Sequence, residues 1–483
     1  MITGPVGSGK STLLRELVPL LPGPKVFLGY QMPPGLSPDG SAPAGSHPLV
    51  SLLLVDAQVD DRAGPRSSSG IPSVLADFSP QGPEPLMALP APLARASEGL
   101  VAAGGGTIIA DSWDRGSEAF FRTQAKGPEA VQTFTAPASA LFAAQSVIPS
   151  TPTNLIICIG PEWGQSMHTL SDGIVDLREE GHAGGRVRVC TVAKVRGAPP
   201  ATPAHLYTLE GGHFRTLSGL APGFVTPVAR PEVDPDPGSE SIWPGSTPFA
   251  RAFGRLRFGG STLISRSSDC PNTVPTILAM PIAMHTLLTG GRVVWIPPTS
   301  IRAARLLGLI GRYVPADTIR ERLRILSASA PDSDLGEFGP VLLPLHEEGT
   351  SEHDVGIPND PRVRPMFPSR YRFLRERRDS TPAVQIVSPD GLRAAAASIG
   401  VTLDPSNIPI VIESFTRLPY FHMVGYGDLD DPVLAYMRPA ADALIEIEMI
   451  YGRPVVFGIR PQTTPFLLDW TEPEGRYSLV PVA

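Results

Sequence analysis

The residue types with the clearest chemistry lie at the start of the chain, in the stretch GPVGSGKST. Residues 4–11 fit the pattern G-x-x-x-x-G-K-[ST], which is typical of a triphosphate-binding loop. Glycines allow positive φ angles and let backbone N–H groups approach phosphate oxygens, while the following helix points its positive end at the same anion. The residues predicted to bind the nucleotide are Gly4, Gly7, Ser8, Gly9, Lys10, Ser11 and Thr12.

Two of these side chains have separate predicted roles. Lys10 would reach the β- and γ-phosphates of ATP, and the Ser11 hydroxyl would bind Mg²⁺. The alternative is a Gly/Ser turn that caps an ordinary helix. The helical run STLLRELVPLL and the strand-like KVFLGY, which come next, favour nucleotide binding. Only residues 1–3 precede the loop, so either the first strand is very short or the native chain starts upstream.

Composition indicates a globular chain of two or three domains. Its 483 residues include 56 prolines and 48 glycines without a triplet repeat, which predicts long punctuated loops. A net charge of −7 argues against a generally basic nucleic-acid-binding body. The three cysteines share no metal or disulfide spacing, and no signal-peptide pattern opens the chain. We therefore expect a cytoplasmic protein with reduced thiols.

The most apolar stretch is TVPTILAMPIAMHTLL, and it raises the question of a membrane span. It is shorter than the roughly 20 residues that a transmembrane helix needs, and prolines and a histidine interrupt it. The sequence predicts a buried core helix here and no membrane association.

The first half alternates strand-like and helical segments, which predicts an α/β domain with a mainly parallel sheet over residues 1–217. The predicted parallel strands lie in KVFLGY, SLLLVDA, GTIIADSWD and NLIICIG. Shorter antiparallel strands are expected in DGIVDLREE, RVRVCTVAKVRG and HLYTLEGGHFRTL. Residues 218–247, rich in proline and acid, are predicted to be a linker to a second domain over residues 248–483.

The second half repeats this order of segments. STLISRSS, the helical TVPTILAMPIAMHTLLTGG and RVVWIPP correspond to the first strand, first helix and second strand. RERLRILSASAP, PIVIESFTRL and RPVVFGI are predicted to replace SLLLVDAQVDD, GTIIADSWDR and NLIICIG. SRSSDCPNTVP offers no G-K-[ST], so we expect a degenerate copy without a phosphate cradle, with a polar, arginine-rich insertion around residues 331–383. The alternative is an unrelated α/β domain.

Residues 1–217 resemble the RecA-like ATPases of the KaiC type. The resemblance depends on GPVGSGKST, on IIADS at residues 108–112, and on SDGIVDL followed by GRVRVCTVAKVRG and YTLEGG. It implies a RecA-like P-loop NTPase fold for the first domain and a degenerate RecA-like fold for the second. The combination of one P-loop domain, a decayed companion and an arginine-rich region is also similar to the archaeal gas-vesicle regulators of the GvpD type.

The resemblance implies roles for three further residues. Asp111 would be the Walker B carboxylate, which binds Mg²⁺ through water or Ser11; the alternative is a helix N-cap. Lys194 and Arg196 alternate with a valine, so both would point to one face of a strand. In the family such a pair reaches the γ-phosphate of a neighbouring subunit, which implies a homo-oligomeric ring or filament. A solvated strand end is the alternative.

One position departs from the family pattern. KaiC-like enzymes have a glutamate just after the second strand to activate the attacking water, and Gln31 stands there in this chain. A glutamine orients a water molecule but does not take its proton. Asp56, Asp60 and Asp61, at the end of the next strand, are candidates to replace this glutamate, and the sequence does not show whether they reach the attacking water. We therefore expect slow ATP hydrolysis, or ATP used as a switch.

Two polar stretches of the second half could bind a partner or a metal. Seven arginines lie between Arg362 and Arg378, interspersed with Phe367, Tyr371 and Phe373. This pattern suits an acidic protein surface, including the chain's own linker, and also suits nucleic-acid phosphates and stacked bases. HEEGTSEHD, at residues 346–354, has metal-capable side chains without a known ligand spacing, and we expect a solvated loop there.

These observations leave three functional hypotheses. The first is a slow ATPase or nucleotide-gated regulator that acts on a protein partner, such as a transcription regulator. The second is a DNA-processing motor or recombinase of the RecA kind. It would need basic loops in the first half, where APASALFAAQSVIPS is neutral and apolar. The third is an interaction protein with a vestigial loop, which the intact Lys10–Ser11 pair disfavours.

Overall fold

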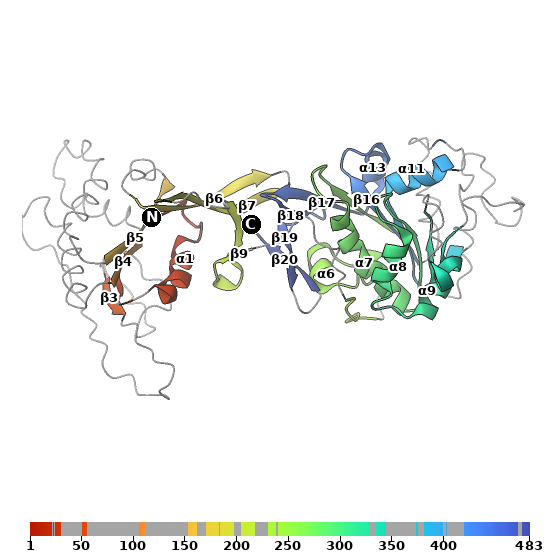
Figure 1. The fold of residues 1–483 in the computed structure, drawn as a ribbon, viewed down its shortest axis with the longest axis horizontal. Coiled ribbons are helices and arrows are strands. Elements are labelled where there is room, and N and C mark those ends of the chain that lie inside the picture. Colours follow the sequence, from red (N-terminus) through yellow and green to blue (C-terminus); the bar gives the residue numbers. More distant parts are fainter. Residues whose placement is uncertain are drawn as a thin grey trace, which may run out of the picture. The chain divides into compact units, whose positions relative to one another are not determined.

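The computed structural model describes the chain in separate stretches that form two compact units. The described residues are 1–21, 23, 25–29, 51–55, 106–111, 153–161, 171–182, 184–197, 204–217, 230–237, 240–327, 335–343, 373–374, 381–398, 402, 420–471 and 476–483. Unit 1 comprises residues 1–180 and 187–216, and unit 2 comprises residues 181–186 and 217–483. Each unit is built on a nine-stranded mixed sheet with helices, which confirms the predicted α/β class (Figure 1).

The sheet of unit 1 has the strand order β3-β2-β4-β5-β1-β6-β7-β8-β9. Its strands are β1 (Ile2–Thr3), β2 (Lys25–Gly29), β3 (Ser51–Val55), β4 (Gly106–Asp111), β5 (Thr153–Ile159), β6 (Gly173–His182), β7 (Gly185–Val195), β8 (Ala204–Thr208) and β9 (Arg215–Thr216). The helical segments within its described residues are α1 (Lys10–Leu17) and the short turns η1 (Val18–Leu20) and η3 (Glu210–Gly212).

The middle of this sheet is parallel. Strands β2, β4, β5, β1 and β6 run in one direction, and β7, β8 and β9 extend the sheet with antiparallel pairing between β7 and β8 and between β8 and β9. This arrangement confirms the predicted parallel core with antiparallel strands at one side, but the prediction was wrong for DGIVDLREE, because β6 pairs in parallel with β1 and is one of the longer strands. The opposite edge differs from the prediction, because β3 pairs antiparallel with β2.

The first strand, β1, has only two residues, and both are buried. Ile2 pairs in parallel with Cys158 of β5 and Val175 of β6. The Met1 ammonium donates to the Gly173 carbonyl over 2.8 Å, and the Val175 N–H donates to the Met1 carbonyl over 2.9 Å. Burial lowers the pKa of this ammonium group. Neighbours on both sides therefore hold a very short strand in the centre of the sheet.

Helix α1 packs on the sheet of unit 1 through two leucines. Leu13 and Leu14 are buried in a cluster that includes Ile109 of β4, Leu177 of β6 and Tyr207 of β8. Burial of a leucine side chain stabilises a fold by about 1.5–3 kcal/mol. This packing keeps the first turn of α1, with Ser11 in it, close to β4.

Unit 2 has a sheet of strand order β14-β13-β15-β16-β12-β17-β18-β19-β20 and a small two-stranded sheet. Its strands are β10 (Ser241–Ile242), β11 (Leu256–Arg257), β12 (Gly260–Arg266), β13 (Arg292–Ile296), β14 (Leu323–Ile325), β15 (Ala383–Val387), β16 (Phe421–Asp428), β17 (Ala443–Ile450), β18 (Arg453–Arg460), β19 (Phe466–Thr471) and β20 (Arg476–Pro481). The helical segments are α6 (Thr247–Phe253), α7 (Thr273–Leu288), α8 (Ala303–Ile310), α9 (Ala316–Arg322), α11 (Pro389–Ser398), α13 (Pro432–Met437), η4 (Gly336–Val341) and η8 (Arg438–Ala440).

The two large sheets have the same strand order. Strand β12 of unit 2 lies in the position of β1, between two parallel neighbours, and β13 to β20 follow the positions of β2 to β9 in a matching pattern. A duplicated domain predicts this correspondence. The sheets differ at one edge, because β14 pairs in parallel with β13 whereas β3 pairs antiparallel with β2.

Two of the predicted strand correspondences are wrong. The position of β4 is taken by β15, residues Ala383–Val387, and not by PIVIESFTRL, which lies outside the described residues. The position of β5 is taken by β16, residues Phe421–Asp428. RPVVFGI forms β18 instead, which pairs antiparallel with β17 and so corresponds to β7. Several apolar runs of similar length compete for these positions, and pairing between distant strands decides among them.

Part of the predicted linker belongs to unit 2. Residues 230–237 and 240–247 are described there, and they include β10 and the start of α6. The Arg255 guanidinium binds both carboxylate oxygens of Asp234 at 2.7 Å, and its Nε donates to the Ser241 hydroxyl. These hydrogen bonds with Arg255 lower the pKa of Asp234. A bidentate ion pair therefore ties this acidic stretch to the folded unit.

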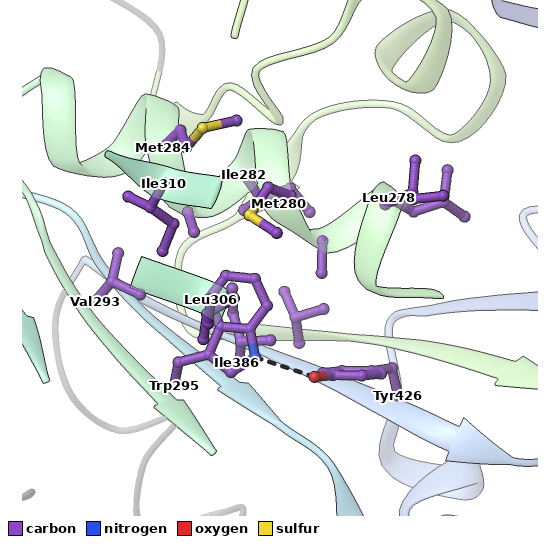
Figure 2. Close-up of a cluster of buried hydrophobic side chains, with 14 of the residues drawn as sticks. Leu278, Met280, Ile282, Met284, Val293, Trp295, Leu306, Ile310, Ile386 and Tyr426 are labelled. Carbon is purple, nitrogen blue, oxygen red and sulfur yellow. Dashed lines mark hydrogen bonds between the residues drawn. The ribbon is translucent and has the colours of Figure 1, made fainter. Parts of the chain in front are cut away.

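The core of unit 2 surrounds helix α7. Every residue from Val274 to Leu287 is buried, which agrees with the prediction of a core helix for this apolar stretch. Side chains of α7 pack against the sheet, where the Trp295 indole N–H of β13 donates to the Tyr426 hydroxyl of β16 over 3.0 Å (Figure 2). No helix in the described stretches is both long and apolar enough to cross a membrane.

Candidate functional site

The stretch between β1 and α1, here called the glycine loop (residues 4–9), has the backbone that its three glycines permit. Gly4, Gly7 and Gly9 have φ angles of 152°, 86° and 86°. A Cβ atom on Gly4 would lie 2.3 Å from the Leu177 carbonyl oxygen, and one on Gly9 would lie 2.6 Å from a methyl carbon of Leu209. A side chain at either position would thus strike its neighbours, whereas Gly7 faces open space.

Helix α1 begins directly at the end of this loop. Gly9 is its N-cap residue in a left-handed conformation, and no side chain caps the first turn. The free N–H groups of a helix start and the positive end of the helix dipole favour an anion at this place. The hydroxyl of Ser8 is buried and has no hydrogen-bond partner among the described residues. The loop therefore has unused donors for a phosphate group.

Two of the predicted metal-binding residues are in direct contact. The Ser11 hydroxyl donates to Asp111 Oδ2 over 2.6 Å. Asp111 is the last residue of β4 and is 5% exposed, and its Oδ1 has no hydrogen-bond partner among the described residues. Because Mg²⁺ takes one or two protein oxygens together with phosphate oxygens and waters, this pair fits such an ion. Within the described residues, no larger cluster of metal-binding side chains occurs.

The Lys10 ammonium lies over the glycine loop. Its Nζ donates to the Gly4 carbonyl at 2.5 Å and to the Pro5 carbonyl at 3.0 Å. An ammonium has three donors on a flexible stem, so it can exchange these carbonyls for phosphate oxygens on the same side of the loop. The structure thus places Lys10, Ser11 and Asp111 at the carboxyl ends of two parallel strands of one sheet, β1 and β4, which β5 separates; open α/β sheets bind ligands at this edge.

Lys194 and Arg196 do not approach the glycine loop of the same unit. Strand β6 runs parallel to β1, and β7 returns beside it after residues 183–184, a connection too short for a crossover. The end of β7 therefore lies at the start of β6, where the Arg196 N–H donates to the Asp172 carbonyl over 2.7 Å. This is the amino-terminal edge of the parallel strands, opposite the loop.

The two side chains also differ in their surroundings. Lys194 lies within β7 and is half-buried, whereas Arg196 follows the last residue of the strand. The Arg196 side chain is 79% exposed and pairs with Asp172 at 2.5 Å. An exposed pair of this kind stabilises a protein by about 0–1 kcal/mol.

Other predicted residues lie outside the described part of the chain. These are Gln31, Asp56, Asp60, Asp61, residues 346–354 and all seven arginines between positions 362 and 378. Phe373 of the arginine-rich stretch is described, and it is a core residue. It is 9% exposed and lies against the guanidinium groups of Arg292 and Arg324, at 4.8 and 4.5 Å from its ring centre. This ring is therefore not available to stack on a nucleic-acid base.

Sequence reasoning assigned no role to Tyr207, which touches the glycine loop. Its hydroxyl donates to the Ser8 carbonyl over 2.6 Å. The sequence analysis also assigned no role to Asp176 of β6, which accepts a hydrogen bond of 2.6 Å from the Thr3 hydroxyl at the end of β1. The stretches YTLEGG and SDGIVDL contain these residues, so the signal was present in the segments that carry the family resemblance.

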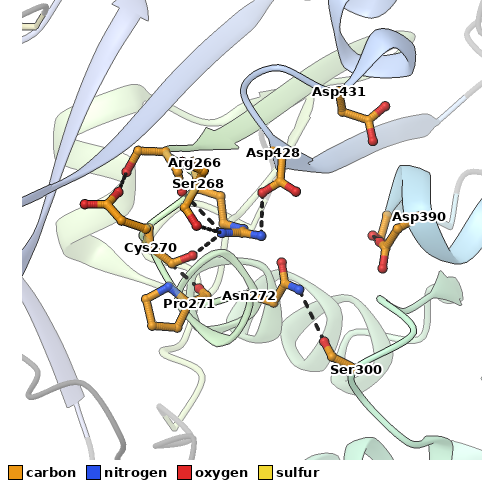
Figure 3. A network of polar contacts seen from close by, with 12 residues as sticks. Arg266, Ser268, Cys270, Pro271, Asn272, Ser300, Asp390, Asp428 and Asp431 are labelled. Atoms are coloured by element: carbon orange, nitrogen blue, oxygen red, sulfur yellow. Dashed lines mark hydrogen bonds and ion pairs between the residues drawn. The ribbon is translucent and has the colours of Figure 1, made fainter.

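The corresponding place in unit 2 has the opposite polarity (Figure 3). Strand β12 ends at Arg266, and the loop to α7 turns carbonyl groups toward the guanidinium of this arginine. Nη1 donates to the carbonyls of Ser267, Ser268 and Cys270, and Nη2 pairs with Asp428 at the end of β16. A buried arginine, held by backbone carbonyls, thus lies in unit 2 at the place that corresponds to the glycine loop of unit 1.

Comparison with known proteins adds no family assignment: no family model matches this sequence, and no curated protein matches it.

Proposed function

We propose that this chain is an ATP-binding protein whose unit 1 is a RecA-like nucleotide domain. In this proposal it acts as a slow ATPase or a nucleotide-gated switch toward a protein partner. The observation that carries the proposal is the 2.6 Å hydrogen bond between Ser11, at the start of α1, and Asp111, at the end of β4. It joins the two residues proposed to bind the magnesium ion, directly beside the glycine loop.

The roles follow from the geometry of the loop. The backbone N–H groups of residues 7–12 and the Lys10 ammonium would bind phosphate oxygens, and Ser11 and Asp111 would bind the ion. Mg-ATP, when bound, supplies a γ-phosphoryl group that can be transferred to water. Asp111 Oδ1 is buried and has no partner within the described residues, which supports this assignment, because an uncompensated buried carboxylate oxygen is costly and a cation or a metal-bound water would satisfy it.

Slow turnover is proposed because of Gln31. This residue stands where KaiC-like enzymes have a glutamate, and an amide cannot accept the proton of the attacking water. Binding of Mg-ATP without rapid hydrolysis suits a switch, since the bound state then persists long enough for a partner to recognise it.

The test is a titration with a fluorescent ATP analogue, with and without Mg²⁺. Lys10→Ala is compared with Arg15→Ala, which removes a positive charge from an exposed position on the same helix. The loss of a charge-assisted hydrogen bond, about 1.5–3 kcal/mol, predicts an affinity roughly 10- to 100-fold lower for Lys10→Ala. Arg15→Ala should bind like the wild type. Equally negligible binding by wild type and Lys10→Ala would contradict the proposal.

A further inference from the structure

The segment from β8 to β9 lies against the glycine loop and the start of α1. Tyr207, in β8, is fully buried and donates a hydrogen bond of 2.6 Å to the Ser8 carbonyl. Leu209, which follows β8, fills the space beside Gly9, as the 2.6 Å approach of its methyl carbon to a Gly9 Cβ position shows. His213 lies 2.8 Å from the Glu16 carboxylate of α1. Three contacts from one short segment therefore converge on the loop and its helix.

Tyr207 is well placed to act as a fixed donor. Its ring stacks on Phe214 with ring centres 4.5 Å apart and planes 23° apart, which limits rotation of the side chain. Burial raises its pKa far above the ordinary value, so the phenol keeps its proton. The hydroxyl therefore keeps the proton that it donates to the Ser8 carbonyl around neutral pH.

This hydrogen bond fixes the plane of one peptide group in the loop. The peptide between Ser8 and Gly9 is planar and trans, so its N–H points away from its C=O. Since Tyr207 holds the carbonyl on the side of β8, the Gly9 N–H must face the opposite side. In a phosphate-binding loop, a carbonyl that points toward the ligand would repel the anion, whereas an N–H that points toward the ligand would bind it.

We propose that Tyr207 is a positioning residue for the phosphate-binding conformation of the glycine loop. It acts through the Ser8–Gly9 peptide and touches neither nucleotide nor metal. The inference rests on the proposed function, since it requires that the loop binds a triphosphate. The variant Tyr207→Phe removes only the hydroxyl and leaves the stacked ring in place.

The test measures affinity for two probes, Mg-ATP and inorganic triphosphate with Mg²⁺. Tyr426→Phe in unit 2 is the matched control, because it also removes a buried, hydrogen-bonded tyrosine hydroxyl, in this case one that accepts from the Trp295 indole. Because Tyr207→Phe loses one buried hydrogen bond, we expect its affinity for each probe to fall by about three- to tenfold. Both probes should be affected, since the defect lies in the phosphate contacts. Tyr426→Phe should lower the melting temperature and leave both affinities unchanged.

A second variant covers the case in which Tyr207→Phe does not fold. Phe214→Leu keeps the hydroxyl but removes the half-buried ring stacked on it, and we expect a smaller loss, about twofold, for both probes. Wild-type affinity in both variants would overturn the inference, as would a loss confined to ATP or an equal loss in Tyr426→Phe. A wild-type chain that binds neither probe would instead overturn the proposed function, and the inference with it.

Discussion

Ser11 and Asp111 lie 100 residues apart in the sequence, and the hydroxyl of one donates to the carboxylate of the other over 2.6 Å. The contact arises because β4 and β1 belong to the same parallel sheet, with β5 between them, so their carboxyl ends reach the same edge. Helix α1 starts above that edge, and its buried leucines hold it there. Parallel pairing thus converts two distant segments into one local polar site.

Asp111→Asn should remove most of the magnesium dependence of ATP binding. The amide keeps the size of the side chain but loses the charge that attracts a divalent cation. We expect similar ATP affinity for the variant with Mg²⁺ and with EDTA, whereas the wild type should lose affinity on chelation. Titration under both conditions measures this. Asp172→Asn, at an exposed position on the opposite sheet edge, should retain the wild-type response.

Gly4→Ala should damage unit 1 far more than Gly7→Ala. Both residues have positive φ, which costs an alanine about 1–2 kcal/mol. Only the Gly4 methyl would also strike backbone, at 2.3 Å from the Leu177 carbonyl oxygen, while the Gly7 methyl meets open space. Thermal denaturation and ATP titration should show a folded, weakened binder for Gly7→Ala and a loss of binding for Gly4→Ala. The reverse order would contradict the loop geometry.

The chain should bind one Mg-ATP, through unit 1. Arg266 and its bonded carbonyls take up the corresponding position in unit 2, where an anion would have to displace a buried guanidinium. Calorimetric titration should give a stoichiometry of one for wild type, and the affinity of this single site should fall in Lys10→Ala. A second site that survives Lys10→Ala would refute the assignment.

Arg266→Ala should destabilise unit 2 by about 2–4 kcal/mol, because it leaves buried carbonyls without their donor. Urea denaturation measures the change. Arg302→Ala provides the comparison, since this arginine is exposed and a surface substitution shifts stability by about 0.5 kcal/mol or less.

His422 should make unit 2 less stable on the acid side of neutrality. Its Nδ1 lies 2.7 Å from the Arg257 carbonyl and its Nε2 lies 3.0 Å from the Thr262 hydroxyl. A carbonyl only accepts, so Nδ1 carries the proton and Nε2 accepts from the threonine. Burial lowers the pKa of His422 from 6.5 to about 4, and the ring is neutral in the folded state above that value.

Between pH 6.5 and 4 the unfolded chain therefore binds a proton that the folded chain does not, and stability falls as the pH falls. The loss from pH 7 to pH 5 should be about 2 kcal/mol. His422→Asn keeps an amide donor for the Arg257 carbonyl but does not titrate, so its denaturation midpoint should depend less on pH in this range. Between pH 7 and 9, where the ring stays neutral, both proteins should change in parallel.

Local patterns in the sequence predicted much of the framework. The apolar runs that became β4 and β5, the antiparallel strands β7 to β9 and the buried helix α7 all occur where their composition indicated. Asp111 was predicted at the end of a buried strand, and it is the last residue of β4. These features depend on the periodicity and apolar content of a single segment, which a sequence displays directly.

Features that depend on pairing between distant segments were not predictable in this way. The runs AVQIV, FHMVGYGD and RPVVFGI are similar in composition. Only the assembled sheet shows that the first two form the parallel strands β15 and β16, and that the third forms β18, which pairs antiparallel with β17. For the same reason the contact of Tyr207 with Ser8 was missed, because it joins residues 199 positions apart. Side-chain alternation predicted a shared face for Lys194 and Arg196, but β7 ends before Arg196.

The central place of β1 has a consequence for how the protein is made. Ile2 is synthesised before both of its partners in the sheet, Cys158 and Val175, which follow it in the sequence by more than a hundred residues. Strands that are far apart in the sequence pair slowly, because the entropic cost of closing the long loop between them comes before the stabilising contacts form. Strand β1 therefore pairs in the sheet only after most of unit 1 has been translated, so the backbone of the glycine loop is fixed late in synthesis.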